Sequence, residues 1–214
     1  MSGRIRLVTL LFFIFCLSVS CSKNTLTSVS IIQTTDLHGT ILPFDYIENR
    51  KIDVSLAQVA SYVKKLREEK DVVVLLDGGD ILQGQPIVYY HNFIDTISTH
   101  VVSEALNWLE YDAQTVGNHD IEAGHPVYDK IIREYKFPLL GANAVDIKSG
   151  EPYFTPYVIL KRKNLKIAVL GLITPAVPNW LPPELYSGME FRDMLETAEK
   201  WMPEILRHKP DLVI

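Results

Sequence analysis

The stretch Val72–Asp80, VVVLLDGGD, decides the fold. Its first five residues form a continuous apolar run, which is typical of a strand buried on both faces in a parallel sheet. Two glycines then permit a sharp turn of the backbone, and Asp80 follows them directly. The stretch therefore predicts a buried strand that ends by presenting a carboxylate at the edge of a sheet.

Strands and amphipathic helices alternate on both sides of this stretch. Before it, Val29–Thr34 is a β-branched run, and apolar residues recur at helical spacing over residues 56–66. After it we expect, in chain order, a helix over residues 94–109, a strand over 113–116, a short helix over 127–135, a strand over 137–140, a hairpin with arms at 157–160 and 165–173, a helix over 194–205, and a strand beginning at Asp211. This alternation predicts an α/β layered fold with a mostly parallel central sheet, in one domain.

The composition excludes several classes of protein. Hydrophobic residues make up 47% of the 214 residues and charged residues 22%, so the chain can bury a core and is neither disordered nor of low complexity. Two cysteines are too few for a small disulfide-stapled fold. The net charge of -5 argues against binding a nucleic acid polymer by electrostatics alone.

Polar side chains follow four consecutive strands of the alternation. They are Asp36 and His38, then Asp80, then Asn118, His119 and Asp120, and finally Asn143. Because ligands bind beyond the carboxyl ends of parallel strands, we expect these side chains to lie along one edge of the sheet. Each motif alone is common turn chemistry, whereas their joint order at successive strand ends favours a catalytic site.

The first three groups suit divalent metal ions. In an extended segment, Asp36 and His38 would point to the same face and could chelate one ion. The two oxygens of Asp80 can bridge two metals, and Asn118 offers one neutral carbonyl oxygen. Such mixed ligation favours Mn, Fe or Zn over Ca.

His119 and Asp120 are the candidate catalytic pair. His119 can reach a substrate oxygen, and Asp120 could hold its imidazole in orientation. The sequence has no Gly-x-Ser-x-Gly segment, no P-loop and no cysteine nucleophile, which favours metal-assisted hydrolysis. We expect surface or capping roles for the other histidines, which are His91, His100, His125 and His208.

These motifs resemble those of the calcineurin-like metallophosphoesterases. Asp36-Leu37-His38, Gly79-Asp80 and Gly117-Asn118-His119-Asp120 match the first three motifs of that family in order and spacing, and the resemblance runs from about Ile31 to the end of the chain. Within the family, the chain is similar to secreted 5'-nucleotidases and to 2',3'-cyclic-nucleotide 2'-phosphodiesterase/3'-nucleotidases. The stretches Thr34–His38, Asp45-Tyr46 and Gly79–Pro86 resemble the cyclic phosphodiesterase branch.

The resemblance implies a phosphoester hydrolase with two divalent metal ions, Mn, Zn or Fe. Asp36 and His38 would bind one metal, Asp80 would bridge both, and Asn118 would bind the second. A hydroxide held between the ions would attack phosphorus.

By the same resemblance, His119 would contact the phosphate and assist the leaving oxygen, with Asp120 steering it. Asn143 would contact the substrate, or a residue that contacts the substrate. The substrate would be an extracytoplasmic nucleotide rather than a nucleic acid polymer, and the residues do not decide between 5', 3' and 2',3'-cyclic phosphates.

The family's later motifs, which supply three more metal-binding histidines, have no counterpart among the 214 residues. Residues 29–214 are therefore expected to be the N-terminal part of a catalytic domain that the missing C-terminal remainder of the same chain completes. The alternative is an exported, non-catalytic fragment that binds metal or nucleotide and lacks half of the metal site. A Ser-His or Gly-His-x-His sequence encoded after Ile214 favours the first hypothesis, and a natural stop codon there favours the second.

Residues 1–20 have the regions of a secretory signal, with two arginines, an apolar run and then small residues. The apolar run is shorter than the roughly 20 residues of a transmembrane helix. Cys21 follows directly and resembles a bacterial lipoprotein cleavage site, so we expect lipidation there; ordinary cleavage nearby, with Cys21 an idle thiol, is the alternative. Residues 21–28 would be a linker, and the protein would be exported to the periplasm or cell surface and anchored to the membrane by its lipid.

Overall fold

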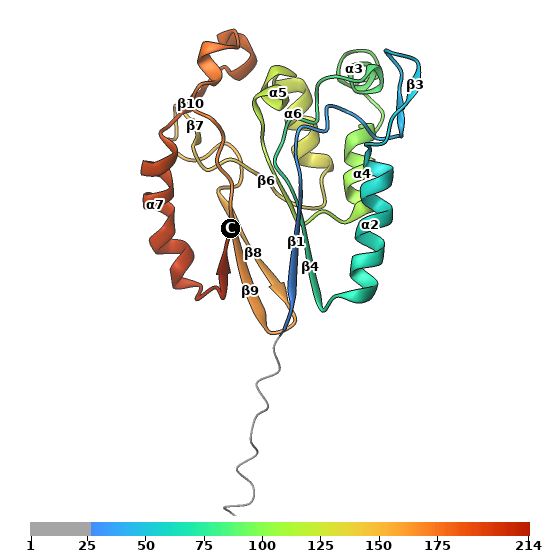
Figure 1. Cartoon of the computed structure of the whole chain (residues 1–214). Coiled ribbons are helices and arrows are strands. Elements are labelled where there is room, and N and C mark those ends of the chain that lie inside the picture. Colours follow the sequence, from blue (N-terminus) through green and yellow to red (C-terminus); the bar gives the residue numbers. More distant parts are fainter. Residues whose placement is uncertain (1–26) are drawn as a thin grey trace, which may run out of the picture.

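The structure, a computed structural model, describes residues 27–214 (Figure 1). Its helices are α2 (Leu56–Glu69), α3 (Pro86–Phe93), α4 (Val101–Leu109), α5 (Asn118–Glu122), α6 (His125–Glu134) and α7 (Met194–Arg207). Its strands are β1 (Val29–Thr34), β2 (Phe44–Asp45), β3 (Arg50–Lys51), β4 (Val72–Asp77), β5 (Ala113–Thr115), β6 (Leu139–Leu140), β7 (Ala144–Asp146), β8 (Tyr157–Arg162), β9 (Leu165–Leu170), β10 (Met189–Phe191) and β11 (Leu212–Val213). Two short 3-10 helices, Val177–Asn179 and Pro183–Tyr186, occupy the proline-rich loop before β10.

The predictions for the N-terminal segment lie outside the described residues. They concern the signal over residues 1–20, the lipidation of Cys21 and all but the last two residues of the linker over 21–28. None of the helices within residues 27–214 combines the length and the apolar character that crossing a membrane requires.

The central sheet has four strands in the order β1-β4-β5-β6. All three pairings are parallel, and the β1–β4 register places Val29 beside Val72 and Thr34 beside Asp77. Strands that are neighbours in this sheet also follow one another in the chain order of its strands. Because all of them are parallel, their carboxyl ends lie in that order along one edge of the sheet. The predicted mostly parallel central sheet is confirmed.

A second sheet, in the order β11-β9-β8, packs against one face of the first. It contains the predicted hairpin, in which β8 and β9 pair antiparallel, and β11 joins β9 in parallel. Val74 and Leu76 of β4 share a buried cluster with Ile167 and Val169 of β9, whereas Leu75 belongs to the core on the helical side. Successive residues of a strand point to opposite faces, so the apolar run of β4 fills both interfaces.

Helices cover the outer face of each sheet, as Figure 1 shows for α2 and α7 on opposite sides of the molecule. Residues of α2, α4, α5 and α6 form the large core against the central sheet. On the other side, α7 lies against β8, where the rings of Trp201 and Tyr157 are 5.8 Å apart and the Tyr157 hydroxyl donates to Glu204 at 2.7 Å. The predicted α/β layered fold is therefore confirmed.

The predicted helix over residues 94–109 is wrong in its first half. Only α4 lies in that range, and residues 94–100 form the loop that joins it to α3. Ile97, which fits the helical spacing, is 94% exposed in the intervening loop. His100 ends that loop, and its Nδ1 accepts the backbone N–H of Val102 at 3.1 Å, so it caps α4 as expected for one of the extra histidines.

Candidate functional site

Hydrogen bonds join the loop after β1 to the loop after β4. The backbone N–H of Asp36 donates to the carbonyl of Gly79, and that of His38 to the carbonyl of Asp80, both at 3.0 Å. The carbonyl of His38 in turn accepts the N–H of Gln85 at 3.0 Å. The first two predicted groups therefore lie side by side at the sheet edge.

The loop after β5 closes onto the same place. The backbone N–H of His119 donates to Oδ1 of Asp80 at 2.8 Å. The imidazole rings of His119 and His38 meet edge to face, with centroids 5.2 Å apart. Asn118 lies between Gly117 and His119, as the first residue of α5. The structure thus brings together the three strand-end groups to which the sequence assigns metal binding.

Three of the candidate metal ligands have left-handed backbone conformations. The φ angles are 52° for Asp36, 45° for His38 and 62° for Asp80. The expectation that Asp36 and His38 lie on an extended segment is therefore wrong, because the chain turns at both residues to bond the loop after β4. Each such conformation costs of order 1–3 kcal/mol in a residue other than glycine, and clusters of them are typical of functional sites.

Asp120 is a buried acceptor for backbone N–H groups. The residue is only 1% exposed. Its two carboxylate oxygens accept hydrogen bonds of 2.8–3.0 Å from four backbone N–H groups in two loops, which are those of Asp80, Ile81, Leu82 and Gly117. Burial raises the pKa of the Asp120 carboxyl group, and the N–H donors oppose that shift. Asp120 therefore fixes the Asp80 loop to the turn that precedes α5.

The contact with the His119 imidazole that the sequence assigned to Asp120 is made by Glu122. Oε2 of Glu122 lies 2.6 Å from Nδ1 of His119, whereas Asp120 points its oxygens at backbone N–H groups. The spacing of His119 and Glu122 in the sequence is the signal for this contact, because side chains three residues apart are neighbours on a helix. We did not expect a helix over residues 118–122, and so Glu122 was missed.

Asn143 is a buried structural residue, which contradicts its assignment as a substrate contact. Its relative exposure is 0%, and its Nδ2 donates to the carbonyls of Ile173 at 2.7 Å and Arg192 at 2.9 Å. Its Oδ1 accepts the N–H of Ile173 at 2.8 Å. Both ends of the amide are therefore used to join the loop after β6 to the segments after β9 and β10.

Asp77, the last residue of β4, is a buried carboxyl group behind the site. It is 2% exposed and accepts hydrogen bonds from Thr34, Gln114 and the N–H of Gly79 at 2.6, 2.7 and 2.9 Å. Burial is the largest cause that raises its pKa from the ordinary 3.8 to about 7, and these three hydrogen bonds oppose the shift.

Asp77→Asn is expected to remove one source of pH dependence from the stability. Since the folded protein holds the Asp77 proton more tightly than the unfolded chain, this residue's contribution is full below pH 4 and is lost as the pH rises through about 7. The loss is about 1.4 kcal/mol for each pH unit in that window. Urea unfolding at pH 5 and pH 7 measures it in both proteins. An equal pH slope in the wild type and the variant contradicts the shift.

The donors present fit part of a divalent metal site. Asp36, His38, Asp80 and Asn118 supply carboxylate, imidazole and amide groups on loops that are bonded to one another. Within residues 27–214, however, no three side chains of His, Cys, Asp or Glu are grouped so that they could hold a metal ion. Two ions of about four ligands each require more donors than these four residues provide.

Comparison with known proteins connects this geometry to a family. Residues 29–214 match the family model of the calcineurin-like phosphoesterases. The chain is 31% identical to a 2',3'-cyclic-nucleotide 2'-phosphodiesterase/3'-nucleotidase of Yersinia enterocolitica, in an alignment that covers 97% of this chain and 34% of the relative. It is also 31% identical to a 5'-nucleotidase of Vibrio cholerae, over 87% of this chain and 32% of the relative.

A solved structure shows the same fold. The calcineurin-like phosphoesterase YfkN from Bacillus subtilis matches with a TM-score of 0.78 and 30% sequence identity, over 86% of this chain and 60% of that chain. The present chain spans about a third of the length of the two curated relatives. Since the family model matches every residue from β1 to the last strand, the chain belongs to the calcineurin-like phosphoesterase family.

Proposed function

We propose that this chain carries part of the active site of a metal-dependent phosphoester hydrolase that acts on nucleotides outside the cytoplasm. The observation that carries the proposal is the convergence of the loops after β1, β4 and β5, with Asp36, His38 and Asp80 in left-handed conformations at their junction. The nucleotidases among the relatives support nucleotides as the substrate class.

In this proposal Asp36, His38, Asp80 and Asn118 hold divalent metal, with Mn, Zn or Fe suited to these donors. When bound, the metal supplies Lewis-acid chemistry that polarises phosphoryl oxygens. Glu122 holds Nδ1 of the His119 imidazole. In its protonated form, His119 donates Nδ1–H to Glu122 and offers Nε2–H to the leaving oxygen.

The site of action is proposed from the sequence. A signal over residues 1–20 would export the protein, and a lipid on Cys21 would anchor it to the membrane at the periplasm or cell surface. A 2',3'-cyclic, a 3' or a 5' phosphate each suits the site. The full-length gene product with Mn²⁺ should release phosphate or nucleoside from at least one of 2',3'-cyclic AMP, 3'-AMP and 5'-AMP. No turnover of any of them, with metal confirmed bound, contradicts the proposal.

Asp80→Asn is expected to weaken Mn²⁺ binding by the 214-residue chain about tenfold or more, because it removes the only carboxylate of the loop after β4 that faces the junction. Calorimetric titration measures the affinity, and we expect weak binding and little turnover even from the unchanged chain. Asp193→Asn is the matched control, since Asp193 is an exposed carboxylate that caps α7. Equal Mn²⁺ affinity in the wild type and Asp80→Asn contradicts the assignment of Asp80.

A non-catalytic role is the second candidate, and the incomplete grouping of ligands within residues 27–214 favours it. The chain would then bind metal or nucleotide without hydrolysing it. The two candidates differ in one measurement on the full-length gene product, because the first expects turnover when metal is bound and the second expects none.

A further inference from the structure

The amino ends of the strands lie at one end of the molecule, opposite the candidate metal-binding loops. β1 begins there at Val29, whose neighbour is Val72 at the start of β4. The turn between β8 and β9 lies at the same end, because Lys163 in this turn bonds Asp71 at 2.5 Å. Figure 1 shows that turn and the C-terminal end of α7 at the lower end of the molecule, with α3 and α5 at the upper end. We define the amino-edge surface by residues 69–71, 161–166 and 207–211.

The amino-edge surface is basic in a chain that is acidic as a whole. Its 14 residues include seven lysines and arginines and three acidic residues, a net charge of +4, whereas the whole chain has -5. The segments that follow β1, β4, β5, β6 and β9 at the opposite end carry 12 acidic and four basic residues. These segments are residues 35–55, 78–85, 116–125, 141–152 and 171–193. The charge of the molecule is therefore divided along the direction of the strands.

Three lysines of the amino-edge surface are available to an external partner. Lys70, Lys161 and Lys209 are exposed, and none of them forms an ion pair within residues 27–214. A row of exposed ammonium groups without acidic partners suits a surface that carries many negative charges.

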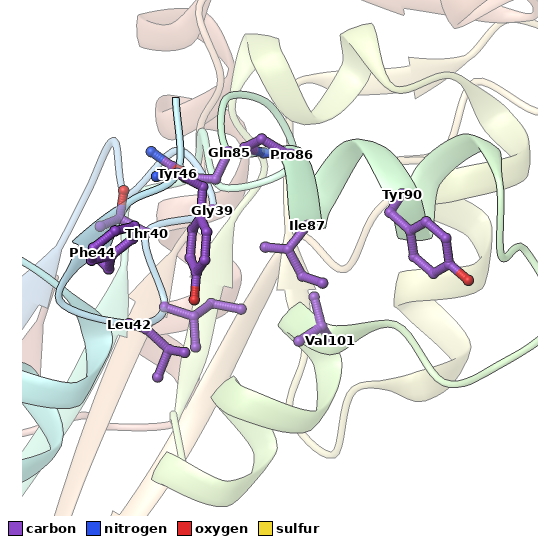
Figure 2. Close-up of a pocket in the computed structure, with 11 residues that line it drawn as sticks. Gly39, Thr40, Leu42, Phe44, Tyr46, Gln85, Pro86, Ile87, Tyr90 and Val101 are labelled. Atoms are coloured by element: carbon purple, nitrogen blue, oxygen red, sulfur yellow. The ribbon is translucent and has the colours of Figure 1, made fainter. Parts of the chain in front are cut away.

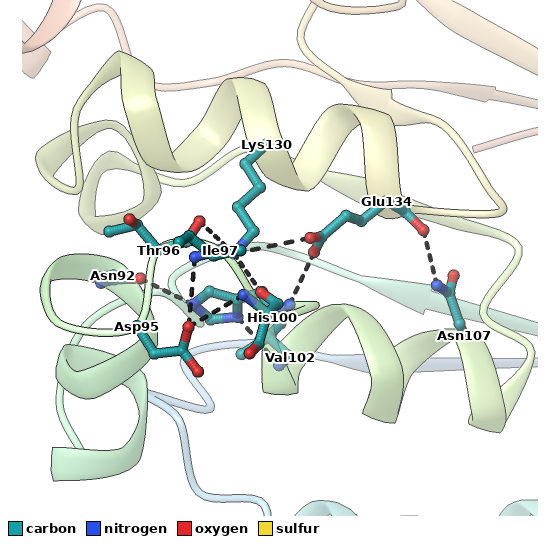
Figure 3. Close-up of polar contacts among 10 residues, drawn as sticks. Asn92, Asp95, Thr96, Ile97, His100, Val102, Asn107, Lys130 and Glu134 are labelled. Carbon is teal, nitrogen blue, oxygen red and sulfur yellow. Dashed lines mark hydrogen bonds and ion pairs between the residues drawn. The ribbon is translucent and has the colours of Figure 1, made fainter.

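Lys130 shows the contrasting case of a lysine whose charge is used inside the fold. Its Nζ donates to the carbonyls of Thr96 and Ser98 at 3.0 and 2.5 Å (Figure 3). The same atom lies 3.8 Å from Oε1 of Glu134. Lys130 therefore fixes the loop between α3 and α4, whereas the three lysines above have no such task.

The proposed lipid anchor lies close to the amino-edge surface along the chain. Val29 is eight residues after Cys21, and eight residues span at most about 29 Å when fully extended. β1 then leads away from this surface through six residues, which is about 20 Å. An anchor on Cys21 therefore keeps the amino-edge surface near the lipid and the metal-binding loops farther from it.

The opposite end of the molecule is the alternative membrane contact, because it carries exposed apolar side chains. Figure 2 shows Leu42 and Tyr46 on one side of a cavity of about 590 Å³ and Ile87 on the other. More than half of the residues that line this cavity come from the segment 35–55, which has four acidic and two basic residues. Anionic headgroups would repel that segment, and so the charges favour the amino-edge surface.

We propose that the amino-edge surface binds the anionic headgroups of the membrane to which Cys21 anchors the protein, so that the metal-binding loops face away from the lipid. The inference rests on the anchoring that forms part of the proposed function. Each lysine near an anionic surface strengthens the contact about fivefold. Since the potential of such a surface decays over about 8 Å at physiological salt, the orientation also leaves the site open to negatively charged nucleotides.

Fluorescence quenching at two introduced cysteines tests the orientation. The 214-residue chain, processed and lipidated in a bacterial host, is placed in vesicles of equal parts phosphatidylcholine and phosphatidylglycerol that contain a headgroup-spin-labelled phospholipid. Cys16 leaves with the signal and the Cys21 thiol carries the lipid, so Asn164→Cys or Ile147→Cys supplies the free thiol for a fluorophore. Both side chains are exposed, Asn164 in the turn between β8 and β9 and Ile147 after β7. We expect strong quenching at position 164 and little at position 147.

Charge reversal tests the role of the three lysines. The combined variant Lys70→Glu, Lys161→Glu and Lys209→Glu should lower the quenching at position 164 at least about twofold, because it replaces attraction by repulsion. Vesicles of phosphatidylcholine alone should have the same effect on the unchanged surface.

A second combined variant is the matched control. Arg50→Glu, Lys51→Glu and Lys148→Glu change the net charge by the same amount, but at the opposite end of the molecule. This variant should leave the quenching at position 164 unchanged. All six side chains are exposed, and circular dichroism confirms that both variants fold.

Several results would overturn the proposal. Equal quenching at positions 164 and 147 contradicts the orientation, and stronger quenching at position 147 assigns the membrane contact to the opposite end. Quenching at position 164 that depends neither on phosphatidylglycerol nor on the three lysines contradicts the headgroup contact. Absence of lipid on Cys21, detected by mass spectrometry, removes the anchoring on which the inference rests. Turnover of p-nitrophenyl phosphate by the full-length gene product reports on the hydrolase separately, so that its failure is distinguished from failure of the membrane contact.

Discussion

Asp120→Ala is expected to lower the free energy of unfolding by about 4 kcal/mol or more, which is most of the stability of many domains. The substitution leaves four backbone N–H groups without their acceptor, in the turn before α5 and in the loop after β4. An unsatisfied buried donor costs about 1–3 kcal/mol, and partial access of water lowers the sum. Urea unfolding followed by circular dichroism measures the change.

A second variant of Asp120 tests the role of its acceptor oxygens, and a variant of Asp193 provides the control. Asp120→Asn keeps one acceptor oxygen, and so it should lose about half as much stability as Asp120→Ala. Asp193→Ala is the matched control, because the Asp193 carboxylate also accepts two backbone N–H groups, at 2.8 and 2.9 Å, but on the exposed end of α7. Its loss should be about 1 kcal/mol, the usual value for a helix cap. Equal losses in Asp120→Ala and Asp193→Ala contradict the prediction.

Gly117→Ala is expected to disrupt the junction of the loops after β4 and β5. A Cβ at position 117 would lie 2.1 Å from Oδ1 and 2.5 Å from the backbone N of Asp80. The backbone there cannot yield easily, because Asp120 holds both the Asp80 and the Gly117 N–H groups. Such overpacking costs typically about 1–3 kcal/mol, and it displaces the Asp80 carboxylate. We therefore expect lower stability by urea unfolding and at least about tenfold weaker Mn²⁺ binding by calorimetry.

Gly150→Ala separates the clash from the general effect of removing a glycine. Gly150 has a φ of 74°, and a Cβ there meets no atom within 4 Å. It should cost about 1–2 kcal/mol for the left-handed conformation alone and leave Mn²⁺ binding unchanged. If Gly117→Ala matched Gly150→Ala in both stability and Mn²⁺ affinity, the result would contradict the predicted clash with Asp80.

The sheet could be predicted from the sequence because burial on two faces leaves a clear pattern. The run Val72–Leu76 contributes to both buried clusters, and the alternation of strands and helices predicts the parallel pairing of the central sheet. The break between α3 and α4 could not be predicted in the same way. Apolar residues at positions 94 and 97 fit the helical spacing, but Ile97 is exposed, and the spacing does not show that His100 supplies a cap.

The convergence of the strand-end motifs could be predicted from the sequence, but the contacts of their side chains could not. The strand-end order brought Asp36, His38, Asp80 and His119 together correctly, because parallel strands share an edge. Which acid touches the His119 imidazole depends on a helical turn of five residues, too short to show an apolar period. Burial of Asn143 depends on partners about 30 and 49 residues away in the chain, which no local pattern reveals.

The left-handed backbone at Asp36, His38 and Asp80 lowers the stability of the fold at positions where we propose metal-binding side chains. At His38 the conformation costs about 1–2 kcal/mol, whereas glycine there loses about 0.5–1 kcal/mol of conformational entropy. Glycine is therefore the more stable choice at the positions where we propose metal-binding side chains. A redesign guided by thermal stability alone would select glycine at these positions, and it would remove the proposed metal-binding side chains while it stabilised the fold.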